Sequence, residues 1–316
     1  MKKLLSLVMV CGLILVAINA MAAEKRLTFA TGGTSGVYFP LGGAIAQVLT
    51  AKSNGALDVT AQASGASVEN IRLIDAGEVN MAIVQNDIAD AAYNGTAPFK
   101  KKFPNARAIA RLYPEYLHIV ASTNSNIKKM ADFKGHKVSV GVRGSGNELN
   151  CRQIFKFFGL SYKNITPMFL PYGDTAEQFK DRLLDGFIFT IGTPNPAIQD
   201  ITTAQEVRFI PLQDSDIDAI TKQFPYLVKD SIPANTYKGQ TQPVPTLSVQ
   251  AILIVNKNMS DEDAYNITKT LFDNLPEIAN EYDMAAEISL KQAKNGITIP
   301  FHPGAEKYFK EKGLGK

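Results

Sequence analysis

The sequence has little cysteine and histidine, and their spacing fits neither an intramolecular disulfide nor a metal site. Its two cysteines are Cys11, inside an N-terminal apolar run, and Cys151. If the N-terminal segment is removed, Cys151 has no partner for an intramolecular disulfide, so packing has to stabilise the fold. The three histidines, His118, His136 and His302, lack the paired spacing of a metal site. We therefore expect no metal and no cofactor.

Net charge is also small. The chain has 33 lysines and arginines against 30 aspartates and glutamates. Loss of Lys2 and Lys3 with the N-terminal segment would leave 31 basic residues against 30 acidic ones. A chain without a basic excess is not expected to bind nucleic acid.

Long hydrophobic runs are missing after the first residues, and those first residues have the pattern of a secretory signal peptide. Lys2 and Lys3 precede an apolar run over 4–16 and small residues that end at Ala22. The run is shorter than the roughly 20 residues that span a bilayer. We expect cleavage near Ala22, export to the periplasm and a soluble mature chain long enough for two lobes.

Motifs for nucleotide binding and covalent catalysis are lacking. The stretch TGGTSGVYFP, residues 31–40, has no Lys-Ser/Thr of a phosphate-binding loop and does not complete G-x-G-x-x-G. No G-x-S-x-G elbow stands in a convincing context. Cys151 falls on an apolar helical face, which favours a buried structural cysteine over a nucleophile. We expect a binding protein; an exported enzyme of similar fold that uses Cys151 or a carboxylate is the alternative.

What the sequence does contain is an alternation of strand-like and helix-like patterns. This alternation predicts an α/β fold with largely parallel sheets. The pattern starts again after residue 121, and two extended segments lie where the chain can pass between two lobes. The predicted bounds are 1–22 for the signal peptide, 23–113 plus 250–316 for lobe I and 114–249 for lobe II, with hinges near 112–121 and 247–255.

Single residues mark several helix ends. Gly77 and Gly95 follow helical patterns, which is typical of C-terminal caps. Asp87 and Ser260 precede helical patterns, so we expect both to be N-caps.

Two glycine-rich turns form the candidate ligand site. A strand-to-helix turn directs free backbone N–H groups and the positive end of the helix dipole at whatever lies in front of it. The first turn alone is compatible with a nucleotide phosphate, a carboxylate or no ligand. Its counterpart in the second half favours a carboxylate held from both sides of a cleft. The candidate residues are Thr34, Ser35 and Gly36 in the first lobe and Gly144, Ser145, Gly146 and Asn147 in the second.

Other polar side chains lie near these turns. The Tyr38 ring can line the cleft or simply pack its helix. Ser64 can face the ligand or, like Ser67, cap the next helix. Gln85 follows a strand at the edge where open α/β sheets bind ligands, and we expect it to contact the ligand. Thr190, Thr193 and Pro194 are the candidates from the later part of the second lobe.

Arg143 is the candidate that would discriminate most between ligands. Its guanidinium, next to the second turn, can pair with a second carboxylate and so favour a dicarboxylate. A solvated surface arginine is the alternative. Arg111 and Tyr113 are weaker candidates for the same role.

Five sequence blocks resemble the TAXI-type solute receptors of tripartite ATP-independent periplasmic (TRAP) transporters. They are GGTSGVYFPLGGAIAQVL, ASGASVENIRLIDAGEVNMAIVQNDIA, DFKGHKVSVGVRGSGNE, GTPNPAI and FHPGAEKYF, in this order. The chain departs from the family at Arg143, where proline or a small residue is common, and at Asn147, where threonine is common. Substrate identity is therefore the least transferable property.

The resemblance implies a type II periplasmic binding protein fold, with two α/β lobes, two hinge strands and a ligand cleft. It implies a monomeric receptor that delivers a small carboxylated solute, glutamate, glutamine or 2-oxoglutarate, to TRAP membrane subunits driven by an ion gradient. A receptor for an ABC importer or for a sensor kinase is the alternative.

Overall fold

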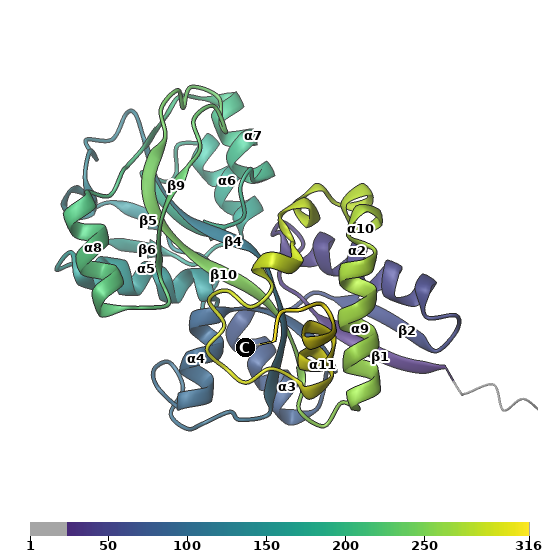
Figure 1. Ribbon diagram of the computed structural model, residues 1–316. Helices are drawn as coiled ribbons and strands as arrows, with labels where there is room; N and C mark the ends of the chain where they lie inside the picture. Colours follow the sequence, from purple (N-terminus) through teal and green to yellow (C-terminus); the bar gives the residue numbers. More distant parts are fainter. Residues whose placement is uncertain (1–23, 316) are drawn as a thin grey trace, which may run out of the picture.

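The computed structural model describes residues 24–315, so the predicted signal peptide and its cleavage site lie outside the described residues. Helices cover a mixed sheet that is bent into two halves (Figure 1). Its strand order is β2-β1-β3-β10-β4-β7-β5-β6, with β8 on β4 and β9 on β10. The predicted α/β class is confirmed.

The first half of the sheet is parallel and carries helices between its strands. β1 pairs with β2 on one side and with β3 on the other. The elements are β1 (Lys25–Ala30), α2 (Tyr38–Lys52), β2 (Leu57–Gln62), α3 (Ser67–Ala76), β3 (Met81–Gln85) and α4 (Asn86–Asn94).

The second half repeats this arrangement. β5 pairs in parallel with β6 and with β7. The elements are β5 (Lys137–Ser139), α5 (Gly146–Phe157), β6 (Thr166–Met168), α6 (Tyr172–Lys180), β7 (Gly186–Ile191), α7 (Pro196–Ala204), β8 (Val207–Phe209), α8 (Asp214–Gln223) and β9 (Val228–Ile232).

Two long strands, β4 (Ala106–Ser122) and β10 (Val244–Asn256), run through both halves. They pair antiparallel with each other, and β4 continues against β7 in the second half. The register between β4 and β10 shifts at Ala251/Ile252 and at Leu253/Ile254. Such irregularities bend a strand pair. The predicted hinges at 112–121 and 247–255 lie in these strands, and the predicted lobe boundaries stay predictions.

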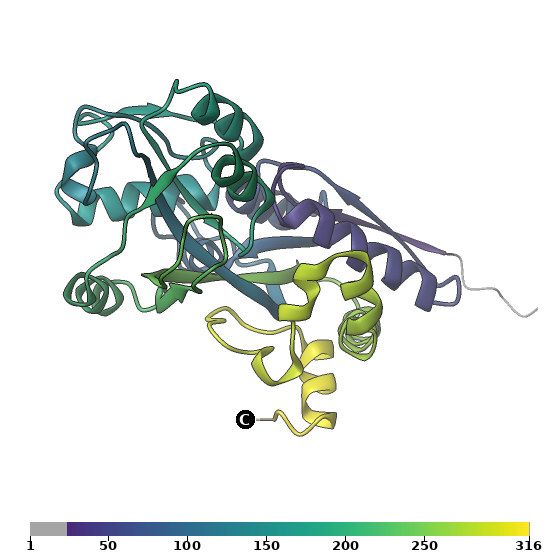
Figure 2. The ribbon, with the colours of Figure 1, turned by 90° about the horizontal axis from the view of Figure 1, so that it is seen from above.

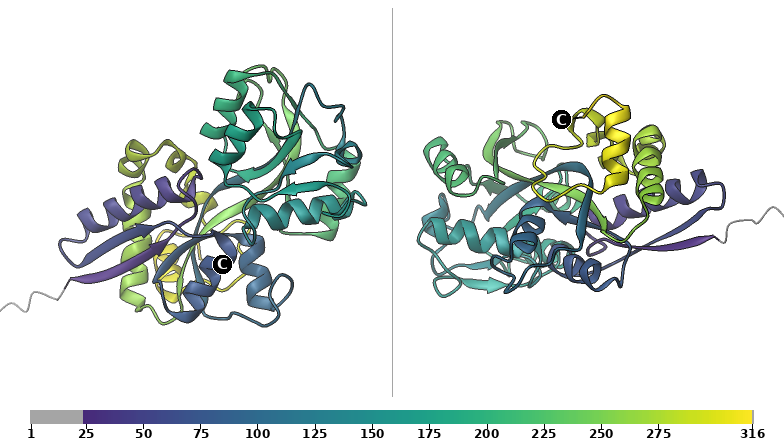
Figure 3. Two further views of the ribbon diagram at one scale, coloured as in Figure 1. Left: turned by 180° about the vertical axis from the view of Figure 1, so that it is seen from behind. Right: turned by 60° about the horizontal axis from the view of Figure 1, so that its bottom comes forward.

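The C-terminal helices return to the first half. α9 and α10 contact α2, and α11 packs on α9 (Figures 2 and 3). Their bounds are α9 (Asp261–Asp273), α10 (Leu275–Glu281) and α11 (Pro303–Glu311), and short 3₁₀ turns cover Met130–Phe133, Asp283–Glu287 and Leu290–Gln292. Within residues 24–315, every helix is too short or too polar to cross a membrane.

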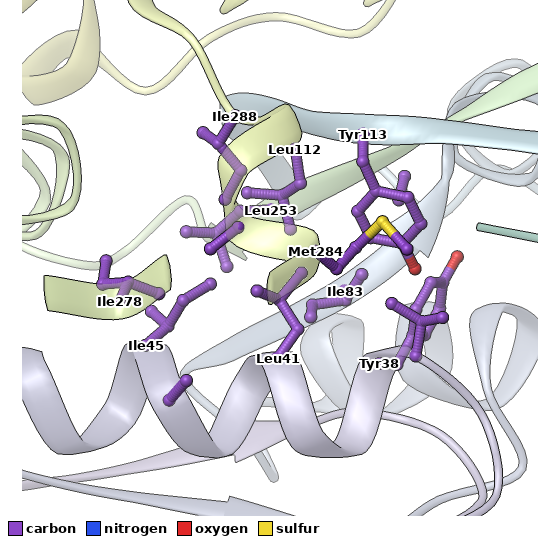
Figure 4. Close-up of a cluster of buried hydrophobic side chains, with 14 of the residues drawn as sticks. Tyr38, Leu41, Ile45, Ile83, Leu112, Tyr113, Leu253, Ile278, Met284 and Ile288 are labelled. Atoms are coloured by element: carbon purple, nitrogen blue, oxygen red, sulfur yellow. The ribbon is translucent and has the colours of Figure 1, made fainter. Parts of the chain in front are cut away.

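A continuous apolar core joins α2 to the sheet and to the C-terminal segment (Figure 4). Leu41 and Ile45 of α2 are fully buried against this core. Burying a side chain of this size contributes about 1.5–3 kcal/mol. Figure 4 also shows the Tyr38 and Tyr113 hydroxyls close together at one end of the cluster, next to the site described below.

Most predicted helix ends are confirmed. Gly77 and Gly95 are left-handed C-caps, and the Ser260 hydroxyl accepts the Asp263 N–H. The predicted Asp87 cap is wrong, because the N-cap of α4 is Gln85. Asp87 lies in the first turn instead, where its carboxylate accepts the Ile88 N–H at 2.9 Å.

Candidate ligand-binding site

A small cavity of about 50 Å³ lies between the two halves, at the carboxyl ends of β1, β2, β3 and β7. We call it the central cavity. Open α/β sheets bind ligands at this edge. Its lining consists of Gly32, Gly33, Gly36, Val37, Tyr38, Ala66, Ser67, Gln85, Glu115, Ser145, Gly146, Asn147, Tyr172, Thr190 and Ile191.

Five helices begin at this cavity. Tyr38, Ser67, Gly146 and Tyr172 are the first residues of α2, α3, α5 and α6, and Gln85 is the N-cap of α4. Helix N-termini present unpaired N–H groups and a partial positive charge. The described lining contains no lysine, arginine or histidine. The positive potential of this site therefore comes from backbone dipoles, which favour an anion.

The structure brings half of the predicted ligand residues to this cavity. They come from both glycine-rich turns and from the ends of β3 and β7. Their roles as ligand contacts stay predictions. They are Gly36, Tyr38, Gln85, Ser145, Gly146, Asn147 and Thr190.

Asn147 has a structural task within this group. Its side-chain amide donates to the carbonyl oxygens of Val140, at 3.0 Å, and Ile188, at 3.1 Å. Its Oδ1 accepts the Thr190 N–H. The amide thus ties α5 to β7, and both of its N–H bonds are used within the protein. A ligand contact of Asn147 would therefore come chiefly from its backbone N–H at the start of α5.

The remaining predicted residues of the first half lie outside the lining. Thr34 and Ser35 are exposed in the turn before α2. The Ser35 hydroxyl accepts the Gly173 N–H at 3.2 Å, which is a contact between the halves. The Ser64 hydroxyl donates to the Thr31 carbonyl at 3.0 Å and accepts the Ala66 N–H at 3.1 Å. Ser64 therefore stabilises its own turn.

In the second half, Arg143 is directed away from the cavity. Its guanidinium lies 3.5 Å from the ring centroid of Phe169, a cation–π contact. Arg143 and Gly144 line a second, larger groove of about 960 Å³, which also lies between the halves because Val68 and Asp87 of the first half share its lining. Arg143 is therefore outside the lining of the central cavity, and its predicted pairing with a ligand stays a prediction.

Thr193 and Pro194 also lie outside the lining. The Thr193 hydroxyl is 2.8 Å from His118 Nε2 and 3.3 Å from the Tyr237 hydroxyl, and Pro194 is exposed. Arg111, the weaker candidate, donates to Gln292 Oε1 at 2.7 Å, away from the central cavity.

Direct contacts between the halves surround the cavity. Asn150 of α5 donates to Asp87 Oδ2 of α4 at 2.7 Å. Asn86 donates to the Tyr226 carbonyl at 3.4 Å. Together with the Ser35 contact, these bonds hold the two halves in direct contact beside the cavity.

Glu115 is the one carboxyl group among the described residues that line the cavity, and it was not predicted from the sequence. Glu115 is 3% exposed. Its Oε2 accepts from the Tyr38 hydroxyl at 3.0 Å, and its Oε1 lies 3.5 Å from the Tyr113 hydroxyl. Burial raises the pKa of Glu115 to about 8, while hydrogen bonds from Tyr38 and Gln85 lower it in part. Glu115 is therefore largely protonated at neutral pH.

Two buried polar atoms of the lining have no hydrogen-bond partner among the described residues. They are Gln85 Oε1 and Thr190 Oγ1, in side chains that are each 2% exposed. A native protein rarely leaves buried polar atoms unpaired, because each costs about 1–3 kcal/mol. The Thr190 hydroxyl can donate to an acceptor on a ligand, whereas Gln85 Oε1 is itself an acceptor and needs a donor.

Ala66, also in the lining, has a strained backbone. Its φ of 67° and ψ of −151° lie in a region that is normally adopted only by glycine. Such strain persists where the surrounding structure imposes it, and it is concentrated at ligand sites.

The pKa of Glu115 predicts a pH dependence of stability. The native protein keeps a proton up to about pH 8 that the unfolded chain releases above its ordinary value of 4.5. The native state binds more protons in this window, so its stability falls as the pH rises through it. Glu115→Gln should therefore raise the melting temperature relative to the wild type at pH 8, by about 2–4 °C for each kcal/mol gained, with little gain at pH 4.5. Calorimetric scans of both proteins at the two pH values check this, and an equal shift at both would contradict it.

The predicted structural role of Cys151 is confirmed. Its side chain is fully buried, with Sγ 3.5 Å from the Ile188 carbonyl oxygen. Burial raises the pKa of the thiol, which disfavours the reactive thiolate.

His118 is also buried, and desolvation lowers its pKa to about 4. Among residues 24–315 no group of three potential ligands is arranged to hold a metal ion.

Comparison with known proteins gives one family and a set of structural neighbours. A family model described as NMT1-like matches residues 29–313. An alkanesulfonate-binding protein from Xanthomonas axonopodis pv. citri, solved with MOPS bound, has a TM-score of 0.51 at 13% identity, over 93% of this chain and 96% of that chain. A putative L-cystine ABC transporter protein from Listeria monocytogenes has a TM-score of 0.54 at 12% identity, over 84% of this chain and 98% of that chain.

A third neighbour is the binding protein component of an ABC phosphonate transporter from Pseudomonas aeruginosa. Its TM-score is 0.53 at 11% identity, over 84% of this chain and 80% of that chain. These likenesses show that the fold is the type II periplasmic binding protein fold, as predicted from the sequence.

The comparisons correct the identification as a TAXI receptor of a TRAP transporter. The matching family model is the NMT1-like one, and the neighbours are proteins named for ABC transporters. The TRAP membrane partner, glutamate, 2-oxoglutarate and the dicarboxylate class lose their basis with that identification. The five sequence blocks on which the TAXI resemblance rests contain the glycine-rich turns that line the central cavity. These blocks therefore indicate the fold and not the type of transporter.

Proposed function

Because the chain belongs to the NMT1-like family, we propose that it is a periplasmic solute receptor that closes around a small solute in the central cavity. The observation that carries the proposal is the cavity itself. It lies where the two halves meet, and its buried Gln85 Oε1 and Thr190 Oγ1 have no partner among the described residues. The Thr190 hydroxyl can donate to a ligand oxygen, and Gln85 Oε1 can accept from a donor group on the ligand. Closure around the ligand strengthens these polar contacts by excluding water.

The solute contains a small oxyanion. Five helix N-termini, from both halves, meet at the cavity, and their partial positive charge favours an anion. The neighbours named for alkanesulfonate and phosphonate agree with this class. The membrane partner is an ABC importer, because the named neighbours with the same fold are components of such transporters.

A ligand screen tests the receptor function. We expect at least one member of a panel of alkanesulfonates, alkylphosphonates, carboxylates and amino acids to raise the melting temperature. Binding at a concentration 1,000 times the dissociation constant stabilises by about 4 kcal/mol. The same ligand should lower the radius of gyration in solution scattering, because it favours the closed form.

Native mass spectrometry of the freshly purified protein is the second measurement. No thermal shift with any panel member and no copurifying small molecule would overturn the receptor function. Uptake of the solute by cells tests the class of importer. We expect depletion of ATP to stop uptake, and we expect uptake to continue when the sodium gradient is collapsed.

A further inference from the structure

We propose that the central cavity binds a singly charged oxyanion together with one proton, which Glu115 carries between Tyr38 and Tyr113. This inference rests on the proposed function and adds a residue that sets its specificity. The proton comes from solvent, so each binding event takes up one oxyanion and, when Glu115 is ionised, one proton.

The geometry gives the two oxygens of Glu115 different surroundings. Oε2 accepts a hydrogen bond from the Tyr38 hydroxyl at 3.0 Å. Oε1 is 3.5 Å from the Tyr113 hydroxyl, which is at the long limit for a hydrogen bond. Oε1 has the weaker of the two tyrosine contacts, so we place the proton on Oε1, from which a ligand in the cavity that Glu115 lines can accept a hydrogen bond.

No cationic side chain faces Glu115 from the elements around it. Tyr38 comes from α2, Tyr113 from β4 itself, and Val249 of β10 is the residue paired with Glu115 in the sheet. The other described neighbours of Glu115 are uncharged, except for Asp87, whose carboxylate raises the pKa of Glu115 further by repulsion. They are Gln85 at the end of β3, Asp87 in α4, Asn150 and Gln153 in α5, and Tyr172 at the start of α6.

Charge balance then decides which ligand fits. An ionised Glu115 would repel an oxyanion inside a cavity that excludes water, where charges interact strongly. A protonated Glu115 adds a donor to those of the helix N-termini at the cavity. The proton on Glu115 and the helix N-termini both raise the affinity for an oxyanion. The bound oxyanion in turn favours the protonated form of Glu115, so the oxyanion and the proton stabilise each other.

A cationic ligand is the opposite case. An ammonium group would favour ionised Glu115, and its binding would release a proton. The helix N-termini at α2, α3, α4 and α5 oppose a cation, so the oxyanion is favoured. The two cases predict opposite pH dependences.

Titration calorimetry between pH 6 and pH 9.5 tests the proposal, with methanesulfonate and propionate as separate probes. Neither probe titrates in this range. Cationic buffers such as bis-Tris and Tris are needed, because sulfonate buffers would compete. We expect the dissociation constant to be flat near pH 6 and to rise toward tenfold per pH unit above pH 8, where Glu115 ionises. Buffers of different ionisation enthalpy should show proton uptake rising from near zero at pH 6 toward one at pH 9.5.

Glu115→Gln should remove both effects, because the carboxamide is neutral at every pH and can still donate. Asp87→Asn is the matched control: it replaces the other buried acid, whose pKa is raised to about 6. It should keep the rise of the dissociation constant with pH, with the onset moved to lower pH because Asp87 no longer raises the pKa of Glu115. Comparing the dissociation constants of methanesulfonate and propionate distinguishes a general oxyanion site from a site selective for sulfonates or for carboxylates.

A pH-independent affinity in the wild type, an affinity that rises with pH, or failure of both probes to bind at pH 6 would each overturn the proposal. The receptor function would survive these results if another solute of the panel, or a copurifying one, binds. The receptor function fails only when no solute binds at any pH.

Discussion

Gly146→Ala is expected to weaken solute binding by about 5- to 150-fold while the protein still folds. A Cβ at Gly146 would lie 1.9 Å from Gln85 Oε1 and 2.4 Å from its Cδ. Gln85 is on the opposite half and is 2% exposed, so its carboxamide can move only into the central cavity that it lines, where it would occupy the space of the ligand. Overpacking of this kind costs about 1–3 kcal/mol, and here the cost falls on closure. Calorimetry with a ligand from the solute screen measures the loss.

The folding of the variant should be unaffected, because the clash exists only when the halves meet. Alanine is also the better helix former in α5. Gly43→Ala in α2 is the matched control, since a Cβ there meets nothing within 4 Å. Scattering should show Gly146→Ala staying extended with ligand, whereas Gly43→Ala becomes compact. Equal ligand affinities for the two variants would mean that closure does not bring Gln85 against Gly146.

The backbone of the site could be predicted from the sequence, because it depends on local chemistry. Glycine-rich turns between strand and helix patterns identified Gly36 and Gly146, and the end of a strand identified Gln85. Strand edges and helix starts are encoded within a few residues, and parallel pairing brings them to one edge of the sheet. The α/β fold class was predictable for the same reason.

Side-chain direction was less predictable. Arg143 adjoins the second turn, but its guanidinium stacks on Phe169, which is 26 positions later in the chain. Gly144, with φ of 75°, turns the backbone between Arg143 and the residues that reach the cavity. Sequence proximity to a turn therefore does not place a long side chain in the cleft.

Glu115 could not be assigned from the sequence, because its partner Tyr38 is 77 positions away. The available signal was a single acid inside the otherwise apolar stretch that forms the middle of β4. A buried acid of this kind needs a tertiary reason, and only the fold brings Tyr38 to it.

Phe187→Ala is expected to lower the free energy of unfolding by about 3–5 kcal/mol. Phe187 lies in β7 and is fully buried, with its ring centroid 5.1 Å from that of Phe179 and 4.5 Å from that of Phe189. Removing the ring leaves a cavity that the neighbouring aromatic rings fill only in part, which adds to the lost burial. For a chain of this size the melting temperature should fall by roughly 6–20 °C.

Leu183→Ala in the same half is the matched control, because Leu183 is 52% exposed. We expect its melting temperature to stay close to that of the wild type, since substitutions on the surface usually change stability by less than about 0.5 kcal/mol. Differential scanning calorimetry of the three proteins at one pH compares them directly. The ring also supports the strand that carries Thr190 to the cavity, so Phe187→Ala should weaken solute binding as well. Equal stability of Phe187→Ala and Leu183→Ala would contradict the placement of this ring in the core.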